Sequence, residues 1–316
     1  MPQPGKDRVT TLYDNTIEIK FVDSNHSYWI RDLEDGKASS WRRVSGSTTI
    51  IGIMDKSGAL VGWAVKLFKR FLTKIIEERT ITIYDIDEGA GLHKQYKETA
   101  ATSGSLVHDW IEAYTKGFNP PMPDQPLVLQ GVMAFKEWEK KEGVHIIGAE
   151  TLLYSKKYNF CGQADFIFYK DDPNKIYLGD YKTSNGLYTG VMMQTASYLR
   201  AIEEMGLIDA EWTDQEWLAN ANLGTEHSQV KFVGRYALRL EKRSPEEFQR
   251  DMEEKGLMDI EYQMFEYVNL DPVDPMAPER NYIDEDFHAF LCARGLRNWS
   301  IDADKRIKQY RNGEIT

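Results

Sequence analysis

The segment FCGQADFIFYKDDPNKIYLGDYK (160–182) decides the fold predicted for this chain. Residues 160–169 and 175–182 are rich in aromatic and β-branched side chains, and the turn-forming letters DDPN lie between them. Two such runs on either side of a short turn are typical of a β-hairpin. We therefore expect two antiparallel strands in the middle of the chain.

Ionisable side chains gather on one face of this predicted hairpin. Because side chains alternate along a strand, Asp180 and Lys182 point to the same side. Asp165 lies at the end of GQAD on the partner strand, where pairing across the turn can bring it beside Asp180. Two close carboxylates repel each other, and a divalent cation removes that repulsion. Hard oxygen ligands with incomplete coordination favour Mg²⁺ or Mn²⁺.

This arrangement suits the hydrolysis of a phosphodiester. Lys182 would orient or activate the attacking water, or stabilise charge that develops on the phosphate. A metal held by the two acids would supply the rest of a metal-assisted hydrolysis. The alternative is an ordinary salt bridge or solvated surface, which is common in a charge-rich chain. Asp180 lies in the apolar run IYLGDY, however, where an unpaired charge is costly.

The pattern continues beyond the hairpin. The run G-x-A-D is followed by G-D-Y-K-T-S and then by a helix with Q-x-x-x-Y, in which Gln194 and Tyr198 share one face. This order resembles the PD-(D/E)xK nucleases, and more narrowly their RecB-like and phage exonuclease branch, over residues 46–240. The resemblance implies that both aspartates and the lysine of the hairpin are catalytic. It also implies that Gln194 and Tyr198 lie over the active site near the nucleic acid, while Ala164 replaces the proline of the family name.

The resemblance assigns roles to residues upstream of the hairpin. His108 in SGSLVHDWIEAY matches a metal-binding histidine on a helix, so the implied metal ligands are His108, Asp165 and Asp180. Glu112 lies one turn after His108, where it either faces the metal or holds the histidine ring. Glu150, on the strand before the hairpin, helps to hold a metal or water by the same resemblance, or else faces solvent.

The predicted fold class is α/β. We expect a restriction-endonuclease-like mixed sheet of four or five strands flanked by helices, with an N-terminal β-hairpin and a helical C-terminal part. Residues 1–47 are expected to form the N-terminal hairpin or arm, 48–243 the nuclease core, and 244–316 a helical extension packed on the core. Helices are predicted over residues 57–79, 103–116, 126–142, 246–267 and 284–311, strands over 144–154 and 231–240, and a hairpin within 15–30.

The charge of the chain bears on its partner. A formal net charge of −11 works against nucleic acid at long range, so DNA binding requires local basic patches. Two groups of residues are candidates for DNA contact, namely Arg42 with Arg43, and Lys66, Arg70 and Lys74 along one helix face. The alternative for each group is an ordinary solvated surface.

The cysteine content and hydropathy limit the remaining possibilities. Cys161 and Cys292 are the two cysteines in the sequence, too few for the four-cysteine iron–sulfur cluster of some relatives. They predict no disulfide framework and indicate a reducing cytoplasm, that of the host cell if the protein is phage-encoded. The first residues lack the apolar segment of a secretory signal, and no apolar run approaches twenty residues, so no membrane association is expected.

These features together predict a Mg²⁺- or Mn²⁺-dependent DNA nuclease. The phage-type resemblance implies an exonuclease in DNA end processing, recombination or repair. The alternatives are a catalytically silent nuclease-fold protein that binds nucleic acid or supports assembly, and an endonuclease active only in a larger complex. The sequence lacks G-x-x-x-x-G-K-[ST], so any ATP-driven resection needs a separate helicase. A single-strand annealing protein is the other expected partner, and a homo-oligomer is compatible with the ring-forming relatives.

Overall fold

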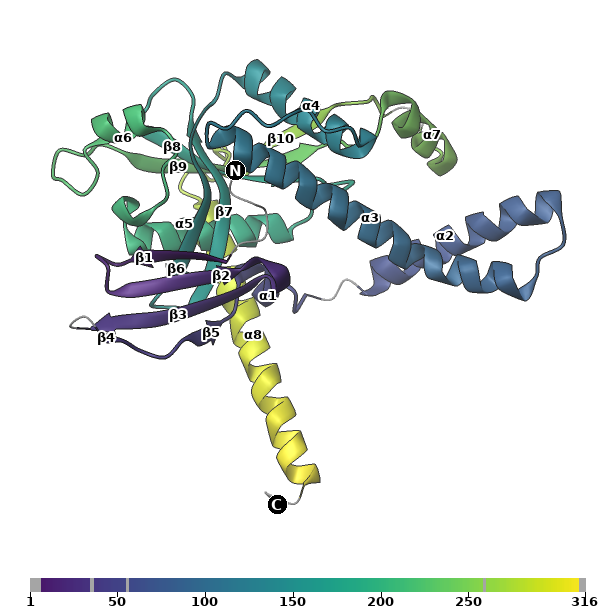
Figure 1. The fold of residues 1–316 in the computed structure, drawn as a ribbon, viewed down its shortest axis with the longest axis horizontal. Helices are drawn as coiled ribbons and strands as arrows, with labels where there is room; N and C mark the ends of the chain where they lie inside the picture. Colours follow the sequence, from purple (N-terminus) through teal and green to yellow (C-terminus); the bar gives the residue numbers. More distant parts are fainter. Residues whose placement is uncertain (1–6, 35–36, 55–56, 258–259, 313–316) are drawn as a thin grey trace.

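The computed structural model describes residues 7–34, 37–54, 57–257 and 260–312. These residues form two five-stranded sheets, with helices around the second (Figure 1). The N-terminal sheet contains β1 (Arg8–Leu12), β2 (Ile17–Val22), β3 (Ser27–Glu34), β4 (Lys37–Ala38) and β5 (Arg42–Val44). The central sheet contains β6 (His145–Ser155), β7 (Phe160–Tyr169), β8 (Lys175–Lys182), β9 (Lys231–Leu240) and β10 (Phe265–Asn269). The helices are α1 (Ser47–Ile51), α2 (Ser57–Glu78), α3 (Ile83–Thr115), α4 (Pro126–Glu142), α5 (Gly190–Met205), α6 (Gln215–Ala221), α7 (Pro245–Lys255) and α8 (Tyr282–Arg311), with 3-10 turns η1 (Asp23–Asn25) and η2 (Leu207–Asp209).

The central sheet is mixed, in the order β10-β9-β8-β7-β6. The predicted hairpin is confirmed, since β7 and β8 begin and end at the predicted residues and pair antiparallel. β8 and β9 pair parallel, and the helix α5 lies in the crossover between them. The prediction of a mixed sheet flanked by helices is therefore confirmed.

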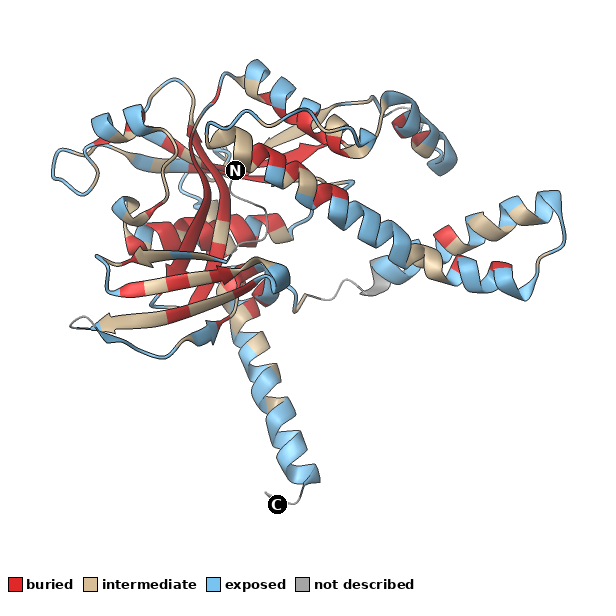
Figure 2. Ribbon diagram, viewed as in Figure 1, coloured by how far each residue is buried: buried red, intermediate tan, exposed pale blue. Residues whose placement is uncertain are grey.

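Different helices cover the two faces of the central sheet. On one face, α3 and α4 bury Val107, Val132, Phe135 and Trp138 against strand residues such as Phe166. On the other face, α5 buries a second set of apolar side chains, which contains Ala196, Leu199, Ile202, Ile167 and Leu178. Figure 2 shows the central strands as the most continuously buried part of the chain. Functional groups on β7 and β8 are thus held by a packed core.

The predicted N-terminal hairpin is present as β2 and β3, but it belongs to a larger antiparallel sheet. The strands β1 and β5 pair on either side of it. Its buried side chains Ile17, Ile19 and Ile30 join the same apolar core as β6 and β7. Because its inner row of isoleucines needs cover, the sheet packs on the core (Figure 1).

The helix α3 is much longer than predicted. The sequence predicted residues 103–116, whereas α3 has 33 residues and begins at Ile83 with a capping box between Thr82 and Asp85. Its first half pairs with α2, and the two form an antiparallel arm that projects from the core (Figure 1). The predicted extent of α2 is confirmed to within one residue, and its apolar side chains Leu60, Trp63 and Ile76 are exposed.

The C-terminal region is also only partly as predicted. The helix α7 begins with a capping box between Ser244 and Glu247. The prediction of helix throughout 246–267 is wrong, because α7 ends at Lys255 and β10 follows as an edge strand paired with β9. Among the described residues, no helix combines the length and apolar character needed to cross a membrane.

Candidate metal centre

Strand register brings the two predicted aspartates face to face. The β7–β8 ladder runs from Tyr169↔Ile176 to Phe166↔Gly179, so Asp165 and Asp180 form the next facing pair. In place of a further ladder bond, the amide of Tyr181 donates to Asp165 Oδ2 at 3.0 Å. Asp165 is 8% exposed and Asp180 is fully buried. The register and the effect of the Asp180 charge on Asp165 agree with the predicted juxtaposition of the acids.

A glycine before Asp180 makes room for this geometry. A Cβ on Gly179 would lie 2.1 Å from Cζ of Phe166, because the phenyl ring crosses directly over the glycine. Phe166 in turn stacks on Tyr181 with ring centroids 5.5 Å apart. The glycine of LGDY is thus a packing requirement next to the acids.

Lys182 and Gln194 hold the carboxylate of Asp180. The Lys182 ammonium lies 2.6 Å from Oδ2, and the Gln194 amide donates to Oδ1 at 3.1 Å. The same amide donates to the Tyr198 hydroxyl at 3.0 Å. Gln194 and Tyr198 are 9% and 4% exposed, so they position Asp180 from within the core, and their contact with nucleic acid stays a prediction.

Two further metal-ligating side chains, His108 and Glu150, gather beside Asp165. One ligand atom each from His108, Glu150 and Asp165 lies within 4.8 Å of the other two. His108 comes from α3, Glu150 from β6 and Asp165 from β7, so three segments meet here. We call these three side chains the donor group. Among the described residues, the donor group contains Glu150 where the resemblance implied Asp180 as a ligand.

Glu150 has an unusual backbone for a strand residue. Its φ of +55° is in the left-handed region, although Ala149↔Phe166 and Thr151↔Ala164 keep the register on both sides. The Tyr181 hydroxyl donates to Glu150 Oε1 at 3.1 Å, and the Gln163 amide donates to Oε2. A left-handed conformation at a non-glycine residue is costly, and such strain concentrates at functional sites.

Burial makes the acids hard to ionise. Burial, and next the charge of Asp180, raise the pKa of Asp165 well above its ordinary value. Burial raises the pKa of Asp180 as well, against the effect of the Lys182 ammonium. Burial and then the charge of Glu112 raise the pKa of Glu150 to about 7. A cation at this point would favour the ionised form of each acid.

The two basic groups shift in different directions: the pKa of His108 is lowered and that of Lys182 is raised. Burial, followed by the charges of Lys182 and Lys242, lowers the pKa of His108 to about 3. Its imidazole is therefore neutral near pH 7, with a lone pair free to ligate a metal. Burial alone would lower the pKa of Lys182, but the charges of Asp180 and Asp165 outweigh it and raise that pKa. Lys182 thus remains an ammonium ion near neutral pH.

The donor set fits a divalent cation. Two carboxylates and one neutral imidazole match Mn²⁺ and also Mg²⁺, both of which accept oxygen ligands and retain waters. Lys182 is 29% exposed in its side chain, so the site reaches solvent beside the acids. Asp180 adds a carboxylate one strand away from Asp165. These residues can therefore place a metal next to an accessible ammonium group.

Other predicted residues lie elsewhere. Arg42 donates to Asn159 and to the Tyr154 hydroxyl, each at 3.0 Å, and both Arg42 and its neighbour Arg43 are exposed on β5. Arg42 thus ties the N-terminal sheet to β6 and the turn after it. The DNA contacts of both arginines stay predictions.

The basic stripe of α2 is remote from the donor group. Gly89 of α3 packs against Phe68 and Phe71 of α2, and His108 lies about 28 Å further along the same helix. Lys66 and Lys74 are exposed, while Arg70 forms an ion pair with Glu254. The role of Lys66, Arg70 and Lys74 in DNA binding also stays a prediction.

The sequence did not single out several residues around the site. Tyr181 and Gln163 hold Glu150, and Arg8 of β1 donates to its carbonyl oxygen. Tyr181 lies within the motif GDYK and Gln163 within GQAD, so the motifs themselves could have indicated these two residues. Arg8 has no such signal. Glu112 bonds Lys116 at 2.5 Å and lies 3.5 Å from Arg8, and neither contact involves the histidine ring.

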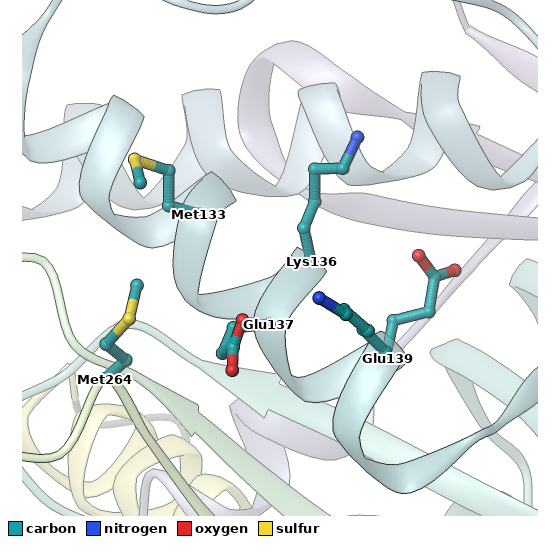
Figure 3. Close-up of a pocket in the computed structure, with 6 residues that line it drawn as sticks. Met133, Lys136, Glu137, Glu139 and Met264 are labelled. Atoms are coloured by element: carbon teal, nitrogen blue, oxygen red, sulfur yellow. The ribbon is translucent and has the colours of Figure 1, made fainter.

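A hollow on the outer side of α4 lies apart from this site (Figure 3). It is lined by Met133, Lys136, Glu137, Glu139, Lys140 and Met264. None of these residues belongs to the donor group or contacts Asp180. Lys136 lies 5.1 Å from the ring centroid of Tyr114, and the Tyr114 hydroxyl donates to Glu139, so the charges here serve the packing of α3 on α4.

No protein-family model matches the chain, and no curated protein is significantly similar to it.

Proposed function

We propose that the protein is a divalent-metal-dependent DNA nuclease that hydrolyses phosphodiester bonds. The observation that carries the proposal is the convergence of His108, Glu150 and Asp165 on one point, beside the facing Asp180 and its Lys182 ammonium. This is the donor set of a metal-assisted hydrolase, and it coincides with the motif that resembles the PD-(D/E)xK nucleases. The mixed sheet with its crossover helix is compatible with a restriction-endonuclease-like fold.

Each residue has a defined part in this proposal. His108, Glu150 and Asp165 would hold the metal, with Asp180 on the adjacent strand. When bound, Mg²⁺ or Mn²⁺ supplies a Lewis acid that neutralises the phosphate and makes water more acidic.

Lys182 and Gln194 have roles that do not require them to bind the metal. Lys182 carries its positive charge beside Asp180, where it would stabilise negative charge on the phosphate and orient the attacking water. Gln194 donates to Oδ1 of Asp180 and so would help to keep the orientation of this carboxylate beside Lys182.

The finer activity rests on the resemblance. The RecB-like and phage branch favours an exonuclease in DNA end processing, recombination or repair, within the cytoplasm of a host cell. DNA is the proposed substrate, with a helicase or a single-strand annealing protein as proposed partners. Comparison of linear and circular DNA distinguishes an exonuclease from an endonuclease.

Purified protein should cleave DNA in Mg²⁺ or Mn²⁺ and lose that activity in EDTA. Asp165→Asn should lower the cleavage rate by about 100-fold or more. The substitution removes a negative charge that would hold the metal, and a bound metal stabilises the transition state by several kcal/mol. The matched control is Asp171→Asn in the exposed β7–β8 turn, which should cleave like the wild type.

Two outcomes would contradict the proposal. Equal cleavage by wild type and Asp165→Asn would show that the activity belongs to another site or to a contaminant. Metal binding without cleavage of any DNA, alone or with an added helicase or annealing protein, would favour the catalytically silent alternative.

A further inference from the structure

The left-handed backbone of Glu150 needs something to hold it. An L-residue in this conformation costs about 1–2 kcal/mol relative to a strand conformation. The neighbouring pairs Ala149↔Phe166 and Thr151↔Ala164 keep the ladder in register on both sides of Glu150, whose φ is positive. A specific partner of the Glu150 peptide would explain why it persists.

Arg8 is that partner. Its Nη2 donates to the carbonyl oxygen of Glu150 at 2.5 Å, across 142 positions of sequence. Arg8 lies on β1, paired with Phe21 of β2, so its backbone is fixed by the N-terminal sheet. The contact therefore joins that sheet directly to the donor group.

The same guanidinium reaches two more acids around the donor group. Nη1 lies 3.5 Å from Glu112, which is one helical turn after His108, and Nη2 lies 3.7 Å from Glu211. Arg8 thus bridges α3, β6 and the segment before α6. The planar fork of arginine can serve several acceptors at once, which a lysine cannot do. Its side chain is 25% exposed, so water screens these contacts only in part.

We propose that Arg8 is a positioning residue of the metal centre, which holds Glu150 in its left-handed conformation and so directs its carboxylate to the donor group. The inference rests on the proposed metal-dependent activity and adds the N-terminal sheet to the site. Outer residues that orient metal ligands contribute strongly to metal affinity. Arg8 does this through the backbone of Glu150, without touching the metal.

The test is Mn²⁺ affinity of the full chain, measured by EPR of the free ion. Arg8→Met should weaken Mn²⁺ binding about 10-fold or more. The matched control is Arg31→Met in β3 of the same sheet, where the guanidinium pairs with Glu18 and lies over Trp41. This control should bind Mn²⁺ like the wild type.

A double-mutant cycle separates positioning from a general loss of structure. In a Glu150→Gln background the carboxylate is already absent, so Arg8→Met should cause no further loss of Mn²⁺ affinity. An equal loss in both backgrounds would overturn the inference, as would wild-type affinity in Arg8→Met. If Arg8→Met does not fold, Arg8→Lys takes its place: weaker binding than the wild type supports the inference, and equal binding overturns it.

The wild type and Asp165→Asn distinguish this inference from the proposed function. If Asp165→Asn weakens Mn²⁺ binding and Arg8→Met does not, the role of Arg8 is overturned and the metal centre stands. If the wild type does not bind Mn²⁺, or binds it independently of Asp165, both proposals are overturned.

Discussion

Single residues of this protein owe their chemistry to burial and to a few close partners. Glu241, at the end of β9, is 3% exposed and accepts hydrogen bonds from the side chains of Arg239 and Arg243. The backbone amides of Lys242 and Arg243 also donate to it, each at 3.0 Å. Burial would raise the pKa of Glu241, but the hydrogen bonds and charge of Arg243, with those of Arg239, lower it from 4.5 to about 2.

This carboxylate should make the stability of the fold depend on pH in the acidic range. Because its pKa is lower in the folded chain, Glu241 stabilises the fold fully above about pH 4.5, and this contribution is lost as the pH falls toward 2. A lowering of this size corresponds to about 3 kcal/mol. The wild type should therefore have a higher free energy of unfolding than Glu241→Gln at pH 7, and this difference should decrease by about 2 kcal/mol at pH 3.

Urea unfolding at the two pH values measures this difference. Glu266→Gln is the control, because Glu266 also bonds Arg239 but is 44% exposed in its side chain. Because solvent screens the pair of Glu266 with Arg239, Glu266→Gln should change the free energy of unfolding little at either pH. A Glu241→Gln effect that is equally large at pH 3 and pH 7 would show that this carboxylate is not ionised preferentially in the folded chain.

At the scale of elements, the β7–β8 hairpin depends on one close contact between strands. The Phe166 ring occupies the space above Gly179, next to Asp180. Adding a methyl group there must displace a ring packed against Tyr181 and Trp138. Overpacking of this kind in a core usually costs about 1–3 kcal/mol.

Gly179→Ala should therefore lower the free energy of unfolding by about 1–3 kcal/mol, measured in urea. Gly186→Ala is the matched control, because a Cβ there meets no atom within 4 Å. A second change, Phe166→Leu, removes the ring that clashes, so the double variant should lose less than the sum of the two single losses. Full additivity would mean that the ring is not the obstacle.

The elements also differ in how far the sequence predicts them. The hairpin was predicted with correct bounds because its apolar runs and its turn are local signals. The first half of α3 was missed because residues such as Glu88 and Lys94 interrupt any apolar period, although Thr82 and Asp85 are a local capping signal. It is helical because it packs on α2, a long-range contact without a local signal. β10 was missed for the same reason, since pairing with β9 defines it.

At the scale of the whole molecule, Arg235 connects parts of the chain that the sequence keeps far apart. Its side chain is fully buried on β9. It donates to the carbonyl of Met192 in α5 at 2.8 Å and forms ion pairs with Asp271 at 2.5 Å and Asp286 at 2.8 Å. It thus joins the central sheet, the crossover helix and α8.

Arg235→Met should destabilise the fold by about 3–5 kcal/mol, because it leaves two acids near the core without their cation. Circular dichroism during urea unfolding measures the loss. Arg280→Met, which breaks the exposed pair with Glu285, should have little effect. A small loss in Arg235→Met would mean that water replaces the guanidinium without cost.

The sequence by itself determined the hairpin, the pairing of its acids and the set of residues from which a metal site could be built. The hairpin and its acids follow from strand alternation and turn chemistry, which act over a few residues, whereas His108 and Glu150 entered only through the family resemblance. The tertiary structure decided that Glu150 joins His108 and Asp165, that Gln194 holds Asp180, and that Arg8 reaches the site from another sheet. Such contacts depend on how distant segments pack and on the left-handed backbone conformation of Glu150. Neither produces a periodic pattern in the sequence.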